Sequence, residues 1–159
     1  MEALLLIGLQ GAGKSTFYAR RLADTHLRLN RDMLRTNHRL DVLFHAALAV
    51  RQPLCLDNTQ ARRSGRARLV ASARAAGFRV VAYWFDVPLA DALARNLQRP
   101  EPARIPEIAI RGLAAKFEPP AADEGFHEIH RVHVVPPGFV VEPLHIAPLT
   151  PDLDPETPR

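Results

Sequence analysis

Short apolar runs alternate along the chain with longer stretches in which apolar residues recur at helical spacing. The runs have the length of buried strands, and we expect five strands, at residues 3–7, 26–30, 53–56, 78–85 and 126–135. The stretches between them predict helices at residues 14–24, 32–36, 40–51, 62–76, 88–97 and 107–117. Strands that alternate with helices in this way indicate an α/β fold with a parallel sheet flanked by helices.

The first predicted strand leads directly into Gly8-Leu9-Gln10-Gly11-Ala12-Gly13-Lys14-Ser15-Thr16, which fits the P-loop pattern G-x-x-x-x-G-K-[ST]. Its glycines let successive backbone N–H groups point at phosphate oxygens, and the helix that follows adds its N-terminal dipole. We expect Lys14 to reach the β- and γ-phosphates of ATP or another nucleoside triphosphate, and Ser15, aided by Thr16, to hold Mg²⁺. The candidate nucleotide-binding residues of the loop are Gly8, Gly11, Ala12, Gly13, Lys14, Ser15 and Thr16.

Carboxylates follow the second and third predicted strands, at the sheet edge where ligands of parallel sheets bind. Asp32 is placed to accept the proton of an acceptor hydroxyl. Arg35 lies three residues later on the same helical face and could bind an anionic group of that acceptor. Asp57 ends a strand, close to where Mg²⁺ or the acceptor would bind. The structural alternative is that both aspartates cap helices and that Arg35 is a solvated surface residue.

Two arginines at helical spacing, Arg95 and Arg99, lead into a loop at residues 99–106 that contains three prolines. Arginines on a mobile helical lid can close over ATP and stabilise charge on the phosphoryl group in transfer. A solvated helix end is the alternative. The predicted fold is therefore a P-loop kinase-like sheet with a helical lid.

Together these motifs resemble those of the 5′-hydroxyl polynucleotide kinase family of P-loop phosphotransferases, over roughly residues 4–117. The match to Asp-x-x-Arg at Asp32 and Arg35 implies that the aspartate is the general base. It implies that the arginine binds the phosphate next to the acceptor nucleotide. The segment that begins at Asp57 looks like the family's acidic motif at a strand end, which helps to shape the acceptor site. Asp57 is also a candidate for an indirect contact to Mg²⁺.

The lid signature of that family is matched by Arg95 and Arg99, which the resemblance implies hold the donor phosphates. Related small-molecule kinases share the P-loop, the aspartate after the second strand and the lid arginines. Catalytic roles are thus expected for Lys14, Asp32, Arg35 and Arg99, and acceptor binding for Asp32, Arg35 and Asp57.

Composition narrows the setting of this chemistry. The chain of 159 residues carries a net charge of +4, which permits a polyanionic partner without requiring one. The helix predicted at residues 62–76 is rich in arginine and could follow a phosphate backbone or present a solvated face. A single cysteine, Cys55, lies in an apolar run, which excludes an internal disulfide and predicts a buried core residue. We see no signal peptide and no apolar run long enough for a membrane, and therefore expect a cytoplasmic protein.

Seven of the 14 prolines fall in the last 24 residues. This predicts a P-loop kinase domain at residues 1–135 and a proline-rich tail at 136–159 made of extended or edge segments. The polynucleotide kinase family often carries a phosphatase or ligase module, so a separate phosphatase or ligase protein is a candidate partner.

The sequence thus favours an ATP- and Mg²⁺-dependent kinase of 5′-hydroxyl ends of DNA or RNA, with a role in nucleic acid repair. Two alternatives stay open. One is a P-loop kinase of a small metabolite or aminoacyl group, and the other is a nucleotide-gated binding module without catalysis. The sequence does not determine whether the acceptor is DNA or RNA, or whether it is a single strand or a duplex end. It also leaves open the preferred base of the nucleotide donor and the oligomeric state.

Overall fold

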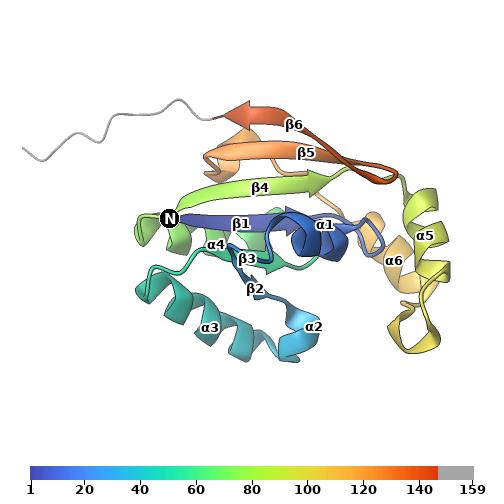
Figure 1. The fold of residues 1–159 in the computed structure, drawn as a ribbon, viewed down its shortest axis with the longest axis horizontal. Coiled ribbons are helices and arrows are strands. Elements are labelled where there is room, and N and C mark those ends of the chain that lie inside the picture. Colours follow the sequence, from blue (N-terminus) through green and yellow to red (C-terminus); the bar gives the residue numbers. More distant parts are fainter. Residues whose placement is uncertain (147–159) are drawn as a thin grey trace, which may run out of the picture.

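The computed structural model describes residues 1–146, which fold around one six-stranded sheet in the order β2-β3-β1-β4-β5-β6 (Figure 1). The strands are β1 (Glu2–Ile7), β2 (Leu27–Leu29), β3 (Leu54–Asp57), β4 (Arg79–Phe85), β5 (Glu128–Val135) and β6 (Gly138–Ile146). Strands β1 to β5 pair in parallel, and β6 returns antiparallel to β5. The predicted α/β fold with a mostly parallel sheet is confirmed.

Helices cover both faces of the sheet and one of its ends. They are α1 (Lys14–Arg21), α2 (Arg31–Leu34), α3 (Asn37–Ala49), α4 (Arg63–Ala75), α5 (Leu89–Leu97) and α6 (Glu107–Ala114), with short 3-10 turns η1 (Glu101–Ala103) and η2 (Ala122–Glu124). None of the helices in residues 1–146 is both long and apolar enough to cross a membrane.

The central strand β1 shows why the sheet is buried on both sides. Its residues Leu4 and Leu6 point to one face, Ala3 and Leu5 point to the other, and all four are at most 2% exposed. β1 pairs in parallel with β3 on one side and with β4 on the other, which makes it a central strand of the sheet. A continuous apolar run is the expected pattern for such a strand.

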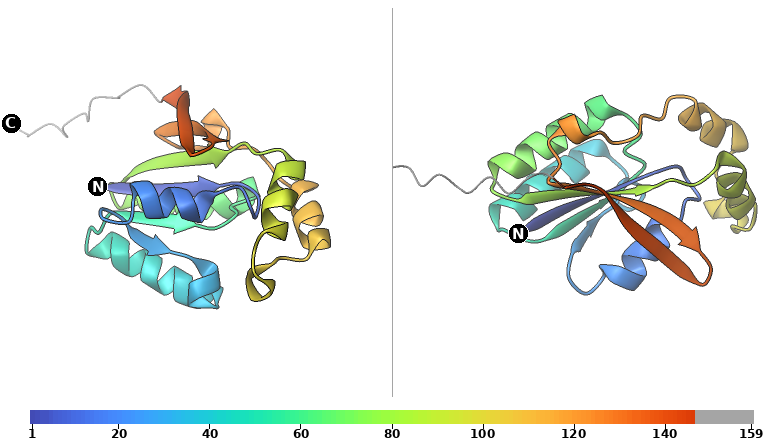
Figure 2. Two further views of the ribbon diagram at one scale, coloured as in Figure 1. Left: turned by 45° about the vertical axis from the view of Figure 1, so that its right-hand side comes forward. Right: turned by 90° about the horizontal axis from the view of Figure 1, so that it is seen from above.

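The two faces carry different helices, as the view from above in Figure 2 shows. Helices α3 and α4 cover one face, where Phe44 and Leu69 pack against the strands. Helix α1 packs on the other face through Phe17, and the β5–β6 hairpin curls over this same face. Phe139 of β6 packs edge-on against Phe17, with 5.2 Å between the ring centroids.

Within the tail predicted at residues 136–159, residues 138–146 form the edge strand β6, and residues 147–159 lie outside the described part of the chain. Pro143 is tolerated in β6 because an edge strand needs ladder hydrogen bonds on only one side.

Helices α5 and α6 stand at the carboxyl ends of the parallel strands, beside the loop between β1 and α1 (Figure 1). The predicted lid segment therefore lies at the sheet edge where ligands of α/β proteins bind.

Candidate functional site

The loop between β1 and α1 has the backbone of a P-loop. Gly11 and Gly13 have φ angles of +81° and +94°, which glycine adopts without strain. A Cβ atom added at Gly11 would lie 2.4 Å from the carbonyl oxygen of Ala92 on α5. Gly11 thus allows the loop to touch the lid helix, and Gly13 leads into α1 at Lys14.

Lys14 is buried within this loop. Its Nζ donates hydrogen bonds of 2.8 Å to the Gly8 carbonyl oxygen and 2.7 Å to that of Leu9. The pKa of Lys14 is lowered to about 8, mainly by burial and also by the Arg99 guanidinium, whereas the carboxylates of Asp57 and Asp32 oppose the decrease. These charges surround one ammonium group.

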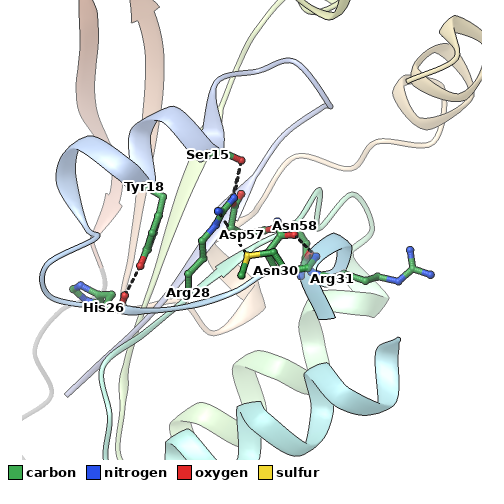
Figure 3. Close-up of polar contacts among 9 residues, drawn as sticks. Ser15, Tyr18, His26, Arg28, Asn30, Arg31, Asp57 and Asn58 are labelled. Carbon is green, nitrogen blue, oxygen red and sulfur yellow. Dashed lines mark hydrogen bonds and ion pairs between the residues drawn. The ribbon is translucent and has the colours of Figure 1, made fainter. Parts of the chain in front are cut away.

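Ser15 and Asp57 meet at the start of α1. The Ser15 hydroxyl donates to Asp57 Oδ2 at 3.0 Å, although the two residues are 42 positions apart. The Asp57 side chain is 2% exposed and also accepts from Arg28, through Nε at 2.9 Å and Nη2 at 2.5 Å (Figure 3). A hydroxyl and a carboxylate oxygen are ligand types that Mg²⁺ prefers.

Asn30 and Asn58 fix the turn that carries Asp32. The Asn30 side chain caps α2 by accepting from the Met33 amide at 3.1 Å, and it donates to the Asp57 carbonyl oxygen at 2.6 Å. Asn58 Oδ1 accepts from the amide of Arg31 at 2.9 Å. These bonds tie the end of β2 to the end of β3 and place Asp32 in the first turn of α2.

A polar cavity of about 270 Å³ joins these groups at the sheet edge. It brings together most of the site residues predicted from the sequence. Those that line it are Gly11, Ala12, Gly13, Lys14, Ser15, Thr16, Asp32, Asp57 and Arg99.

Three predicted residues do not line the cavity. Gly8 lies behind it, where its amide donates to the Thr59 carbonyl oxygen at 3.0 Å. Arg35 ends α2 with a φ of +70° and is exposed, so the acceptor-binding role predicted for it has no support from the cavity. Arg95 is half-buried in α5, and its Nη1 finds no hydrogen-bond partner among residues 1–146.

Arg99 reaches the cavity because the loop that carries it is closed by Asn96. The buried Asn96 side chain donates to the Ile105 carbonyl oxygen at 2.7 Å and accepts from the Ile105 amide at 3.0 Å. This pair of bonds joins the end of α5 to the segment before α6 and closes the loop at residues 98–105.

Several residues of the site were not predicted from the sequence, namely Gln10, Arg28, Asn30, Arg31, Asn58, Thr59 and Ile105. Arg28 stands in a short alternating strand, where a polar residue is typical of a solvated position, so its sequence context gave no signal. The signal for Asn30 and Asn58 was their position next to the two strand-end aspartates.

The model of a known family matches residues 23–120, which run from the end of the α1 segment to beyond α6, and its description is AAA domain. The chain belongs to the AAA domain family. The match spans more than half of the chain and includes Asp32, Asp57 and Arg99.

Solved structures similar to this AAA domain protein include kinases. A gluconokinase from Sinorhizobium meliloti 1021 superimposes with a TM-score of 0.61 at 18% identity, over 86% of this chain and 84% of the gluconokinase. The APS kinase of Mycobacterium tuberculosis, in complex with AMPPNP and APS, gives 0.60 at 22% identity, over 83% and 87%. Kti12 of Chaetomium thermophilum, in complex with ADP-AlF3, gives 0.63 at 16% identity, over 82% and 88%. The AAA domain protein therefore has the P-loop kinase fold.

Proposed function

We propose that this protein is an ATP-dependent phosphotransferase that acts on a hydroxyl group of a small metabolite. The observation that carries the proposal is the cavity itself, where the P-loop, a strand-end carboxylate and a lid arginine converge around Lys14. Phosphoryl transfer needs little more from a protein than positioned charge and a proton acceptor.

In the proposed reaction the acceptor hydroxyl oxygen forms a bond to the γ-phosphorus while the bond from that phosphorus to the β,γ-bridging oxygen breaks. Asp32 takes the hydroxyl proton, and ADP leaves. Lys14 and the loop amides bind the phosphates, and Arg99 compensates charge that develops on the transferred group. Mg²⁺ bound with the nucleotide would neutralise the β- and γ-phosphates, and the oxygens of Ser15 and Asp57 suit it in kind.

The ion pairs made by arginines of helix α4 favour a small acceptor over a polynucleotide. Helix α4 is arginine-rich, but Arg63, Arg66 and Arg68 form ion pairs with acidic residues of the same chain. These charges are compensated and are not a free track for a polyanion. Similar solved structures include a gluconokinase, an APS kinase and a sugar kinase, whose names point to small acceptors.

A kinase of polynucleotide 5′-hydroxyl ends is the second candidate. It is supported by the spacing of Asp32 and Arg35, and by the exposure of both residues, one in the first turn of α2 and one at its C-terminal end. A large acceptor needs such an open approach, whereas a small one does not.

Transfer of labelled γ-phosphate tests both candidates in one experiment. The acceptors are a panel of sugars, sugar acids and nucleotides with free hydroxyl groups, a 5′-hydroxyl oligonucleotide and its 5′-phosphorylated form. We expect label on a small acceptor. Label on the 5′-hydroxyl oligonucleotide alone would establish the second candidate, and ATP binding without transfer to any acceptor would indicate a nucleotide-gated binding module.

The variant Asp32→Asn tests the proton acceptor. We expect it to lower the transfer rate at least about a hundredfold while the Kd of ADP changes little, because the amide cannot accept the proton. Asp24→Asn is the matched control, because Asp24 is exposed and follows the end of α1 that lies away from the P-loop. Transfer that continues at the wild-type rate in Asp32→Asn would remove Asp32 from this role.

A further inference from the structure

Arg28 lies against the two oxygens that the proposed metal nucleotide would use. It sits on the edge strand β2, and its side chain extends across the end of β3 toward α1 (Figure 3). Its Nη2 donates to Ser15 Oγ at 3.0 Å and to Asp57 Oδ2 at 2.5 Å, and its Nε donates to the same carboxylate oxygen at 2.9 Å. One guanidinium thus bonds both groups at once.

A divalent cation and this guanidinium would compete for one carboxylate oxygen. Two neighbouring ligands of Mg²⁺ at about 2.1 Å in octahedral geometry lie about 3.0 Å apart, and Ser15 Oγ and Asp57 Oδ2 are separated by 3.0 Å. The same spacing already accommodates Arg28. Asp57 Oδ2 accepts three hydrogen bonds in this arrangement, which leaves little room for a cation on that atom.

The surroundings of Arg28 can accommodate its guanidinium both when it is bonded to Asp57 and when a metal ion has displaced it. The guanidinium carbon lies 5.3 Å from the centroid of the Tyr18 ring, and the Tyr18 hydroxyl donates to the His26 carbonyl oxygen at 2.7 Å, which holds the ring still. The Arg28 side chain is 28% exposed, whereas that of Asp57 is 2% exposed. Arg28 can therefore withdraw along the ring toward solvent, but Asp57 cannot move out to water.

We propose that Arg28 is a built-in competitor of the divalent cation, which neutralises the buried Asp57 carboxylate until a metal nucleotide displaces it. Arg28 then sets the metal concentration at which the site is loaded. The inference rests on the proposed function for its role in catalysis, but the competition itself can be measured with metal alone.

The test is the binding of Mn²⁺, followed by the electron paramagnetic resonance signal of the free ion, with and without ADP. If the Arg28-bound arrangement holds about nine-tenths of the molecules, its removal raises the apparent affinity about tenfold. We therefore expect Arg28→Gln to bind Mn²⁺ about tenfold more tightly than wild type, and Arg28→Gln/Asp57→Asn to lose this gain. Arg21→Gln, which removes an exposed arginine of α1, controls for the change in net charge.

Arg28→Lys provides a second variant that keeps a positive charge beside Asp57 but loses the fork that bonds both oxygens. It should fall between wild type and Arg28→Gln. An affinity of Arg28→Gln equal to that of Arg21→Gln, or weaker than wild type, would overturn the proposal. If ADP does not bind to any variant, the proposed function fails, and the arm without ADP still decides whether Arg28 competes with the metal.

Discussion

At the scale of single residues, Lys14 shows how burial couples the protonation of a side chain to the binding of a phosphate group. Its ammonium is held by two loop carbonyl oxygens and lies among Asp57, Asp32 and Arg99. Burial disfavours the charged form and lowers the pKa of Lys14 to about 8, well below its ordinary value of 10.5. A phosphate group that binds there would favour the charged form again.

We predict from this pKa that ADP binds more weakly as the pH rises above 8. Below that pH, Lys14 is already protonated. Above it the free protein must take up a proton in order to bind, so the Kd should rise by up to about tenfold per pH unit. Calorimetric titrations between about pH 7.5 and 9.5, in buffers of different ionisation enthalpy, measure both the Kd and the proton uptake.

Lys14→Met is the control for this dependence. It should bind ADP weakly, and its Kd should not change in the same way over this pH range. A wild-type Kd that stays constant across the range would contradict the assignment of the lowered pKa to Lys14.

At the scale of elements, the lid is organised by one buried amide. Asn96 is 3% exposed, and both polar ends of its side chain bond the backbone of Ile105. Arg104 adds bonds to the carbonyl oxygens of Leu97 and Arg99 in the same loop. The loop that presents Arg99 to the cavity is therefore held closed from within.

Asn96→Ala should open this loop and weaken the site. The change removes both hydrogen bonds to the half-buried Ile105 backbone, which costs about 1–3 kcal/mol of the free energy of unfolding. Urea denaturation measures this loss, and limited proteolysis should show new cleavage within residues 98–105. Gln98→Ala, an exposed neighbour, should leave both measurements unchanged. Equal proteolysis of the two variants would show that Asn96 does not close the loop.

At the scale of the whole molecule, Arg66 joins segments that lie far apart in the sequence. Its fully buried guanidinium pairs with Glu124 through two bonds of 2.6 Å, and it donates to the carbonyl oxygens of Gln60 and Glu118, both at 2.8 Å. These contacts tie α4 to the loop after β3 and to the chain that leaves α6. The lid and the strand-end segment of the site are thus anchored to one residue on the far side of the sheet.

Arg66→Met should lower the free energy of unfolding by about 3–5 kcal/mol, because it leaves the Glu124 carboxylate buried without its partner. Arg66→Met/Glu124→Gln should recover part of this loss, since the uncompensated charge is removed. Chemical denaturation measures both. Arg63→Met is the matched control, because its pair with Asp123 is exposed and should contribute little. A loss in Arg66→Met as small as that in Arg63→Met would contradict the anchoring role.

The sequence alone determined the α/β fold class and the parts of the site that are contiguous in the chain. The P-loop could be predicted because its glycines and Lys14 act through local backbone geometry, which neighbouring residues specify. The buried strands could be predicted because a strand covered on both faces is apolar throughout, and Cys55 in such a strand is fully buried as expected. Burial also raises the pKa of the Cys55 thiol, in keeping with a core residue.

Only the tertiary structure decided how charges from separate segments are paired. Arg28 with Asp57 and Arg66 with Glu124 are bonded across 29 and 58 positions, and in the sequence these arginines look like any others. The reason is physical: the partner of a charge depends on which strands and loops lie side by side, and that order follows from the packing of the whole core. Arg35 and Arg99 give a further example. Sequence motifs predicted both arginines to lie in the site, but only Arg99 lines the cavity.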